Sequence, residues 1–192
     1  MVLVILGIVL AVGVPGMSNW MLARKAEDAA GFYKDGLAMA RSQAMLHNSA
    51  SRLVLIDNAN GQMDWRVDLC FPNDSEPCTA TTGSWSSTTA PSSDDPDGTA
   101  GFRSLLRSAS NLPPENAMVS SVLAEGADEV YFTPLGWVDG RVSPRISRIQ
   151  LAPSARRSGA FAPVAVALTL GGVATICNPD PADRSPRKCP PQ

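Results

Sequence analysis

The first 46 residues constrain the fold more than any other part of the chain. Residues 1–17 carry no charged side chain, and this length is just short of the roughly 20 apolar residues that cross a bilayer. Trp20 follows as an interfacial aromatic, before Arg24 and Lys25. A cleavable secretion signal is disfavoured because the pattern continues past the small residues into a helix. We therefore expect residues 1–20 to be embedded in a membrane or a filament core. The apolar positions that would pack there, with the proline among them, are Leu3, Ile5, Leu6, Val9, Leu10, Val14 and Pro15.

Helical periodicity continues beyond this run. Apolar residues recur every three or four positions, which predicts an amphipathic helix over residues 21–50: Leu22, Ala26, Ala29, Tyr33, Leu37, Ala40 and Ala44. Residues 47–49, His-Asn-Ser, offer capping chemistry for its end. Pro15 could separate an anchor from an unrelated helix, but the continuous phase favours one kinked helix. Ala26, Ala29, Ala30, Ala38 and Ala40 would permit close approach of neighbouring helices, or they only reflect helix propensity.

Short apolar or alternating runs follow the helix and predict a β-rich head over residues 51–192. Residues 52–57 and 62–70 predict a hairpin around the turn NANG. Further strands are expected at residues 117–124, 129–133, 145–152, 161–170 and 172–177. Residues 79–100 form a long low-complexity loop, and residues 102–109 are expected to form a short helical turn with Leu105 and Leu106 inward. The fold class is α+β, with a long N-terminal helix packed on an antiparallel sheet.

The four cysteines form two close pairs in sequence. Cys70 precedes Cys78 and Cys177 precedes Cys189, each with Pro-, Asn- and Asp-rich residues between them. Neither spacing fits a zinc site, and the chain has one histidine. We expect two local disulfides, the second closing the tail 178–192, and therefore an oxidising compartment. Free buried thiols are the alternative.

The inventory of polar residues does not favour an enzyme, and we expect no cofactor and no metal. The lone His47 lies at the end of the helix, where a capping or solvent-exposed role is expected. Residues 94–98, Asp-Asp-Pro-Asp-Gly, could ligate Ca²⁺ but lack EF-hand spacing, so a solvated acidic loop is favoured. The net charge is −2, yet residues 141–192 hold 8 basic and 2 acidic side chains, so the C-terminal quarter is cationic.

Four stretches, in order along the chain, resemble one family. They are VILGIVLAVGVP (4–15), ARSQAMLHNS (40–49), EVYFTPLGWVDGR (129–141) and GGVATIC (171–177). The chain resembles the GspH/FimT minor pilins and pseudopilins of type IV pili and type II secretion systems. The last two stretches are similar to that family's I-x-F-x-P-x-G turn and its terminal GRVRxC strand. The leader and cleavage region of the family, whose new N-terminus is methylated, would sit just before Met1, and we expect the natural chain to start upstream.

The resemblance implies a pilin-like fold and a structural role in pilus assembly, within a priming or tip complex. It implies a single-pass inner-membrane protein with a periplasmic head, surrounded by lipid before assembly and by other minor pilins and the major pilin afterwards. Loop 79–100 and tail 178–192 are the surfaces expected to specify these partners. The alternatives are a type II secretion pseudopilin of the minor H type and a DNA-binding minor pilin of natural transformation. The arginine positions of GRVRxC are Gly172 and Ala174 here, so DNA contact would fall to Arg156, Arg157, Arg184, Arg187 and Lys188.

Overall fold

A computed structural model describes residues 2–72, 77–124, 126–180, 182 and 185–190. The side chains of residues 1–16 lie outside this description, and with them the seven predicted apolar assembly positions from Leu3 to Pro15. Among the residues that are described, no helix combines the length and apolarity needed to cross a membrane.

A single helix, α1 (Val2–Leu46), forms the N-terminal part of the molecule. Its backbone is helical through position 15, so the chain follows the single-helix alternative. The helix ends at Leu46, and Asn48 follows with a left-handed φ of 48°. The amide of Ser49 then donates to the carbonyl of Ala44 over 3.0 Å, which satisfies one of the open carbonyl groups at the helix end. The predicted end at residues 47–49 is confirmed.

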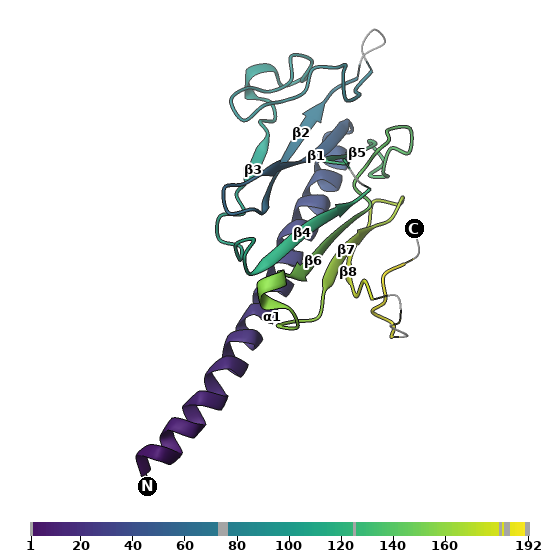
Figure 1. Ribbon diagram of the computed structural model, residues 1–192. Coiled ribbons are helices and arrows are strands. Elements are labelled where there is room, and N and C mark those ends of the chain that lie inside the picture. Colours follow the sequence, from purple (N-terminus) through teal and green to yellow (C-terminus); the bar gives the residue numbers. More distant parts are fainter. Residues whose placement is uncertain (1, 73–76, 125, 181, 183–184, 191–192) are drawn as a thin grey trace.

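The second half of α1 packs on the head, and the first half extends away from it (Figure 1). All seven residues of the predicted apolar face are buried, from Leu22 at 9% exposed to Ala44 at 0%. Of the alanines expected to meet neighbouring helices, Ala26, Ala29, Ala30 and Ala40 are buried here against the chain's own strands. That expectation was wrong for these four, because their small side chains let the sheets of the head approach the helix. Only Ala38 of this group is exposed.

The first sheet has the strand order β3-β2-β1-β5 and is antiparallel throughout. Its strands are β1 (Ala50–Asp57), β2 (Met63–Cys70), β3 (Leu105–Arg107) and β5 (Glu129–Phe132). The β1–β2 pair confirms the predicted hairpin, with Ala50 opposite Cys70 and Asp57 opposite Met63. Leu53 and Val67, which face each other across the pair, are both buried beneath the helix.

The second sheet has the order β4-β6-β7-β8 and is also antiparallel. Its strands are β4 (Met118–Leu123), β6 (Arg148–Pro153), β7 (Val164–Leu168) and β8 (Ala174–Cys177). Both sheets contribute to one core with α1, which includes Phe132 from the first sheet and Ile149 and Leu151 from the second. The α+β layout, a helix packed on antiparallel sheets, is therefore confirmed.

Residues 102–109 do not form the predicted helical turn. They contain the edge strand β3, in which Leu106 pairs with Arg66 of β2. Leu105 and Leu106 are 40% and 50% exposed instead of inward. The pairing is with a strand about 40 residues earlier in the chain, and local periodicity cannot reveal such a partner. Two short 3₁₀ turns, η1 (Gly98–Ala100) and η2 (Ala155–Arg157), complete the described elements.

Candidate assembly surface

Three of the four stretches that carry the family resemblance meet at one point near the end of α1. The first of these three is residues 40–49, which include Arg41, and the second is residues 129–141, which include Gly136. The Nε of Arg41 donates to the carbonyl oxygen of Gly136 over 3.1 Å. Gly172 of the third lies against the same carbonyl and against the Arg41 side chain, so that a Cβ there would overlap the Gly136 oxygen. Gly136 and Gly172 have φ values of 75°, which favour glycine. The contact joins the helix to a turn from each sheet.

Each of these two turns exposes apolar side chains. The turn after β5 is closed by the amide of Thr133, which donates to Trp137 O over 2.8 Å, and the β7–β8 turn by the amide of Thr169, which donates to Val173 O over 3.0 Å. The amide of Val138 donates to Leu170 O over 2.9 Å and ties the two turns together. We define the turn patch as Leu135, Trp137, Leu170 and Val173, which are 67%, 60%, 63% and 46% exposed.

The turn patch was not among the predicted site residues. The signal that could have found it is a large apolar residue next to a glycine in each of two predicted turns. Exposed apolar side chains gathered on adjacent turns are typical of protein contact surfaces. Isolated exposed residues need no such explanation.

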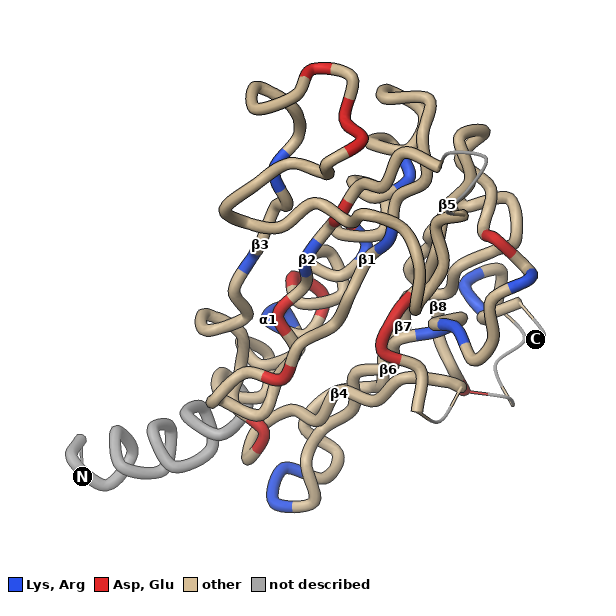
Figure 2. The backbone as a smooth tube through the Cα atoms, turned by 90° about the horizontal axis from the view of Figure 1, so that it is seen from above, with Lys and Arg blue, Asp and Glu red and all other residues tan. Residues whose placement is uncertain are grey.

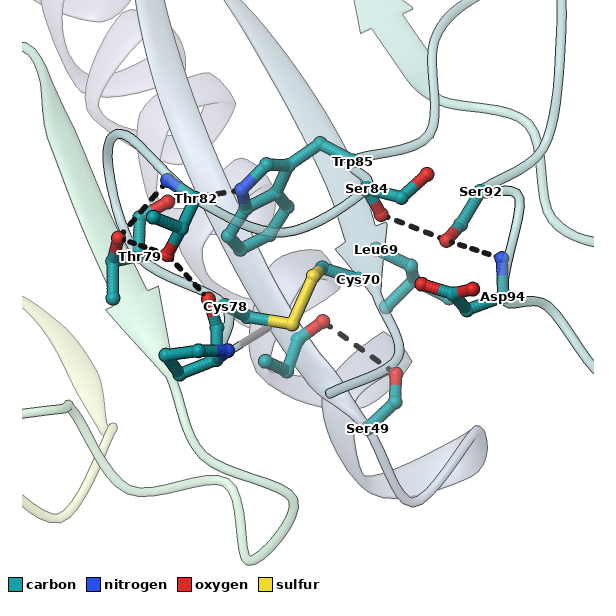
Figure 3. Close-up of a disulfide and its surroundings, with 12 residues drawn as sticks. Ser49, Leu69, Cys70, Cys78, Thr79, Thr82, Ser84, Trp85, Ser92 and Asp94 are labelled. Carbon is teal, nitrogen blue, oxygen red and sulfur yellow. Dashed lines mark hydrogen bonds between the residues drawn. A yellow bond between two sulfur atoms is a disulfide. The ribbon is translucent and has the colours of Figure 1, made fainter. Parts of the chain in front are cut away.

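The Cys70–Cys78 disulfide is confirmed, with 6.0 Å between the Cα atoms. It fastens the start of the long loop to the end of β2 (Figure 3). Within the loop, the Trp85 indole donates to Thr79 O over 3.0 Å and Ser92 Oγ donates to Ser84 O over 2.7 Å. The loop 79–100 is therefore held by its own hydrogen bonds, and it contacts the first sheet through Trp85 and Ser86, where the amide of Ser86 donates to Leu69 O over 2.8 Å.

Trp85 of this loop packs on a cluster of charges on β1, β2 and β5. Arg52 donates to the fully buried Asp68 over 2.9 Å and contacts Glu129 at 3.4 Å. The Trp85 ring lies over the Arg52 guanidinium, 4.4 Å from ring centroid to Cζ, an attractive cation–π arrangement. Tyr131 donates to the Glu129 carboxylate. Because every charge here has an opposite partner, the cluster fits a structural role in holding the loop.

The titration of the cluster follows from its burial. Burial alone would lower the pKa of Arg52, but the carboxylates of Glu129 and Asp68 outweigh it and raise that pKa. Burial, with the hydrogen bond to Glu129, raises the pKa of Tyr131 to about 12. Arg52 therefore stays charged and Tyr131 stays neutral at physiological pH.

The second disulfide, Cys177–Cys189, is also confirmed. It holds the tail against the end of β8. Two backbone hydrogen bonds support it there: Asn178 N donates to Arg187 O over 2.6 Å, and Cys189 N donates to Asn178 O over 2.9 Å. An open groove of about 500 Å³ lies between this tail and α1. Its lining includes Ala23 and Glu27 from the helix and Arg187 from the tail.

The arginines expected to contact DNA do not share one segment. Arg156 and Arg157 are exposed on η2, and Arg187 and Lys188 are exposed in the tail. Arg184 lies outside the described residues. Lys and Arg positions are scattered over the head, as are Asp and Glu positions (Figure 2). At the family's first arginine position, Gly172, a side chain would overlap the Gly136 carbonyl, so this position cannot present an arginine in the fold described here.

Two weaker candidates have structural roles. The Asp95 carboxylate is buried and accepts the amides of Asp97 and Phe102, each over 2.9 Å. The prediction of a solvated acidic loop is therefore wrong for Asp95, which binds the loop's own backbone. His47 neither caps the helix nor faces only solvent, because its half-buried ring packs edge-on at 6.4 Å from Phe71 and 5.5 Å from Phe102. In the described part of the chain, no group of three or more His, Cys, Asp or Glu side chains could hold a metal ion.

Comparison with known proteins gave no relative. No protein-family model, no curated protein and no solved structure matches this chain.

Proposed function

We propose that the chain is a structural subunit of the GspH/FimT type, a minor pilin that acts by packing. Its N-terminal helix is surrounded by inner-membrane lipid before assembly and by the helices of other pilins afterwards. The head lies in the periplasm and contacts other minor pilins. A type IV pilus is the first candidate assembly, and a type II secretion pseudopilus is the alternative.

One observation carries this proposal. α1 buries a face against its own head from Leu22 onward, but the turn before it exposes Met17, Trp20 and Met21 at 64%, 59% and 47%. The sequence N-terminal to this turn is uncharged. Burying apolar surface is worth about 25 cal/mol per Å², so such a helix end is stabilised by lipid or by other helices.

The turn patch supports contacts between heads. Its four apolar side chains sit on turns whose backbones are fixed by the Arg41–Gly136 contact, so a partner would meet a preorganised surface. Loop 79–100 and the disulfide-closed tail remain our candidates for partner specificity. DNA binding is the less favoured role, because Gly172 cannot carry the family's arginine.

Deletion of the gene in its source organism tests the proposal. We expect loss of sheared surface pili, restored by the wild-type gene but not by Leu135→Gln with Leu170→Gln. The matched control is Leu105→Gln with Leu106→Gln, which alters two exposed leucines on β3 and should restore pili. Loss of protein secretion with intact pili would favour the pseudopilus. A deletion strain with normal pili and normal secretion would contradict both assignments.

A further inference from the structure

The lower edge of the head combines basic and aromatic side chains around the emerging helix. η2 lies at this edge, beside the point where α1 leaves the head (Figure 1, light green turn). The position of η2 along the axis of α1 is fixed by the residues that follow it, because Phe161 is buried in the core with Leu22 and Ala26. We define the lower rim by its exposed members: Trp20, Arg24, Lys25, Arg156 and Arg157.

We propose that the lower rim binds anionic lipid headgroups and seats the head on the membrane. The inference rests on the proposed function, since the anchored helix brings the rim to the bilayer. The ligand chemistry is the phosphodiester of an anionic lipid such as phosphatidylglycerol.

Distances along the helix place the rim at headgroup depth. The apolar run ends at Met17, before Ser18 and Asn19, and at 1.5 Å per residue Arg24 lies about 10 Å beyond Met17 along the axis. The polar layer on each side of the hydrocarbon core is roughly 5–8 Å thick. Trp20 therefore falls within this layer, and Arg24 and Lys25 lie a few ångströms beyond it, inside the Debye length of about 8 Å.

The side chains fit an interfacial role. Trp20 is 59% exposed, and the Arg24 guanidinium lies over its ring at 5.7 Å. Aromatic rings of this kind favour the headgroup level, with a basic residue beside them. The two arginines of η2 are consecutive and exposed, so both guanidinium groups are accessible to phosphate oxygens.

The charges on the two sides of α1 differ, and this difference favours one tilt of the head relative to the membrane. On the side of the second sheet, η2 adds Arg156 and Arg157, and the groove beside the helix is lined by Arg187 together with Glu27, which borders both grooves. On the side of the first sheet, the groove of about 480 Å³ beside the helix is lined by Glu27, Asp28 and Asp35, with Arg107. Acidic side chains also lie near the rim: Glu27 pairs with Arg24 at 2.9 Å, and Glu115 is exposed in the loop before β4. The η2 side is therefore the side drawn toward an anionic surface.

The test uses the full chain in nanodiscs, with an environment-sensitive NBD fluorophore on Ser158→Cys, next to η2. In discs of equal parts phosphatidylcholine and phosphatidylglycerol, we expect brighter, blue-shifted emission than in phosphatidylcholine alone, and reversal by high salt. A label on Thr88→Cys, in the long loop, should not respond. Arg156→Gln with Arg157→Gln should abolish the difference, and Arg103→Gln with Arg141→Gln, an equal charge change at exposed positions outside the rim, should preserve it.

Two outcomes overturn the rim proposal and leave the proposed function standing. One is equal emission from the label at residue 158 in the two lipid mixtures. The other is that the control double variant loses the emission difference as fully as the η2 double variant does. A chain that does not enter the discs overturns the anchoring in the proposed function. The rim is then tested by flotation on phosphatidylglycerol vesicles, where removing η2's two arginines should weaken binding by about fivefold for each arginine. Equal recovery of the wild type and the η2 variant would overturn the proposal there.

Discussion

The indole of Trp65 lies against the backbone of α1 at Gly36, so that a Cβ on Gly36 would come within 2.9 Å of the ring. The indole N–H donates to Phe32 O over 3.0 Å. Trp65 of β2 thus holds its strand against α1 in two ways, because its ring packs on the helix and its N–H donates to a helix carbonyl. Gly36 is needed because the ring occupies the place of its side chain.

Replacing Gly36 with alanine should destabilise the protein, although alanine favours helices. The overpacking is expected to cost about 1–3 kcal/mol, which exceeds the roughly 1 kcal/mol gained in helix propensity. Gly31 is the matched control, because a Cβ there meets no atom within 4 Å. Gly31→Ala should stabilise by about 0.5–1 kcal/mol. Chemical unfolding followed by circular dichroism measures both, and equal shifts for the two variants would contradict the packing described.

Gly172 and Gly171 form a second matched pair. Gly172→Ala should lower the free energy of unfolding by about 1–3 kcal/mol, because its φ of 75° and the Gly136 carbonyl both oppose a Cβ. At Gly171 the nearest atom that a Cβ would meet is Thr169 Oγ1 at 3.8 Å, an ordinary contact, so Gly171→Ala should change stability by less than about 0.5 kcal/mol. Amide exchange at Val138 should accelerate only in Gly172→Ala. Unchanged exchange there would argue against the joined turns.

Both tyrosines of the chain should resist ionisation in the folded protein. Burial raises the pKa of Tyr33, and burial with the Glu129 hydrogen bond raises that of Tyr131 to about 12. The unfolded chain loses these protons near pH 10, so their contribution to stability is complete below pH 10 and is lost as pH rises toward 12. Tyrosinate absorbance should stay flat through pH 10 and rise with unfolding. Tyr131→Phe should reduce the alkaline loss of stability, and a normal titration near pH 10 in the folded state would refute the burial argument.

The two disulfides should stabilise different segments. Replacing Cys70 and Cys78 with serine should cost about 2–4 kcal/mol and increase amide exchange in residues 77–104. The same change at Cys177 and Cys189 should release the tail and leave that loop protected. Exchange measured by mass spectrometry separates the two effects. Four alkylatable thiols in the unreduced protein would disprove both bonds.

Local pattern predicted the elements that depend on short-range order. The buried face of α1, from Leu22 to Ala44, follows the 3.6-residue period, and the β1–β2 hairpin follows from NANG between two apolar runs. Both disulfides join cysteines close in sequence, so their geometry is set by short loops.

Features that depend on distant pairing were missed. β3 forms because its backbone completes the edge of β2, and its leucines remain exposed. The Arg41–Gly136 contact spans 95 residues, and the stacking of Trp85 on Arg52 requires the long loop to fold back over the sheet. No periodicity within one segment encodes these contacts.

The alanine-rich buried face of α1 fixes the azimuth of the helix within the head. Successive residues are about 100° apart around the axis, so a rotation by one position would bring charged side chains such as Lys25 into the place of Ala26. The exposed Trp20 therefore keeps a constant angle to the turn patch in every copy of the chain. In the proposed assembly, that angle would determine which neighbouring head each head contacts, so the packing of one subunit's core would constrain the symmetry of the filament.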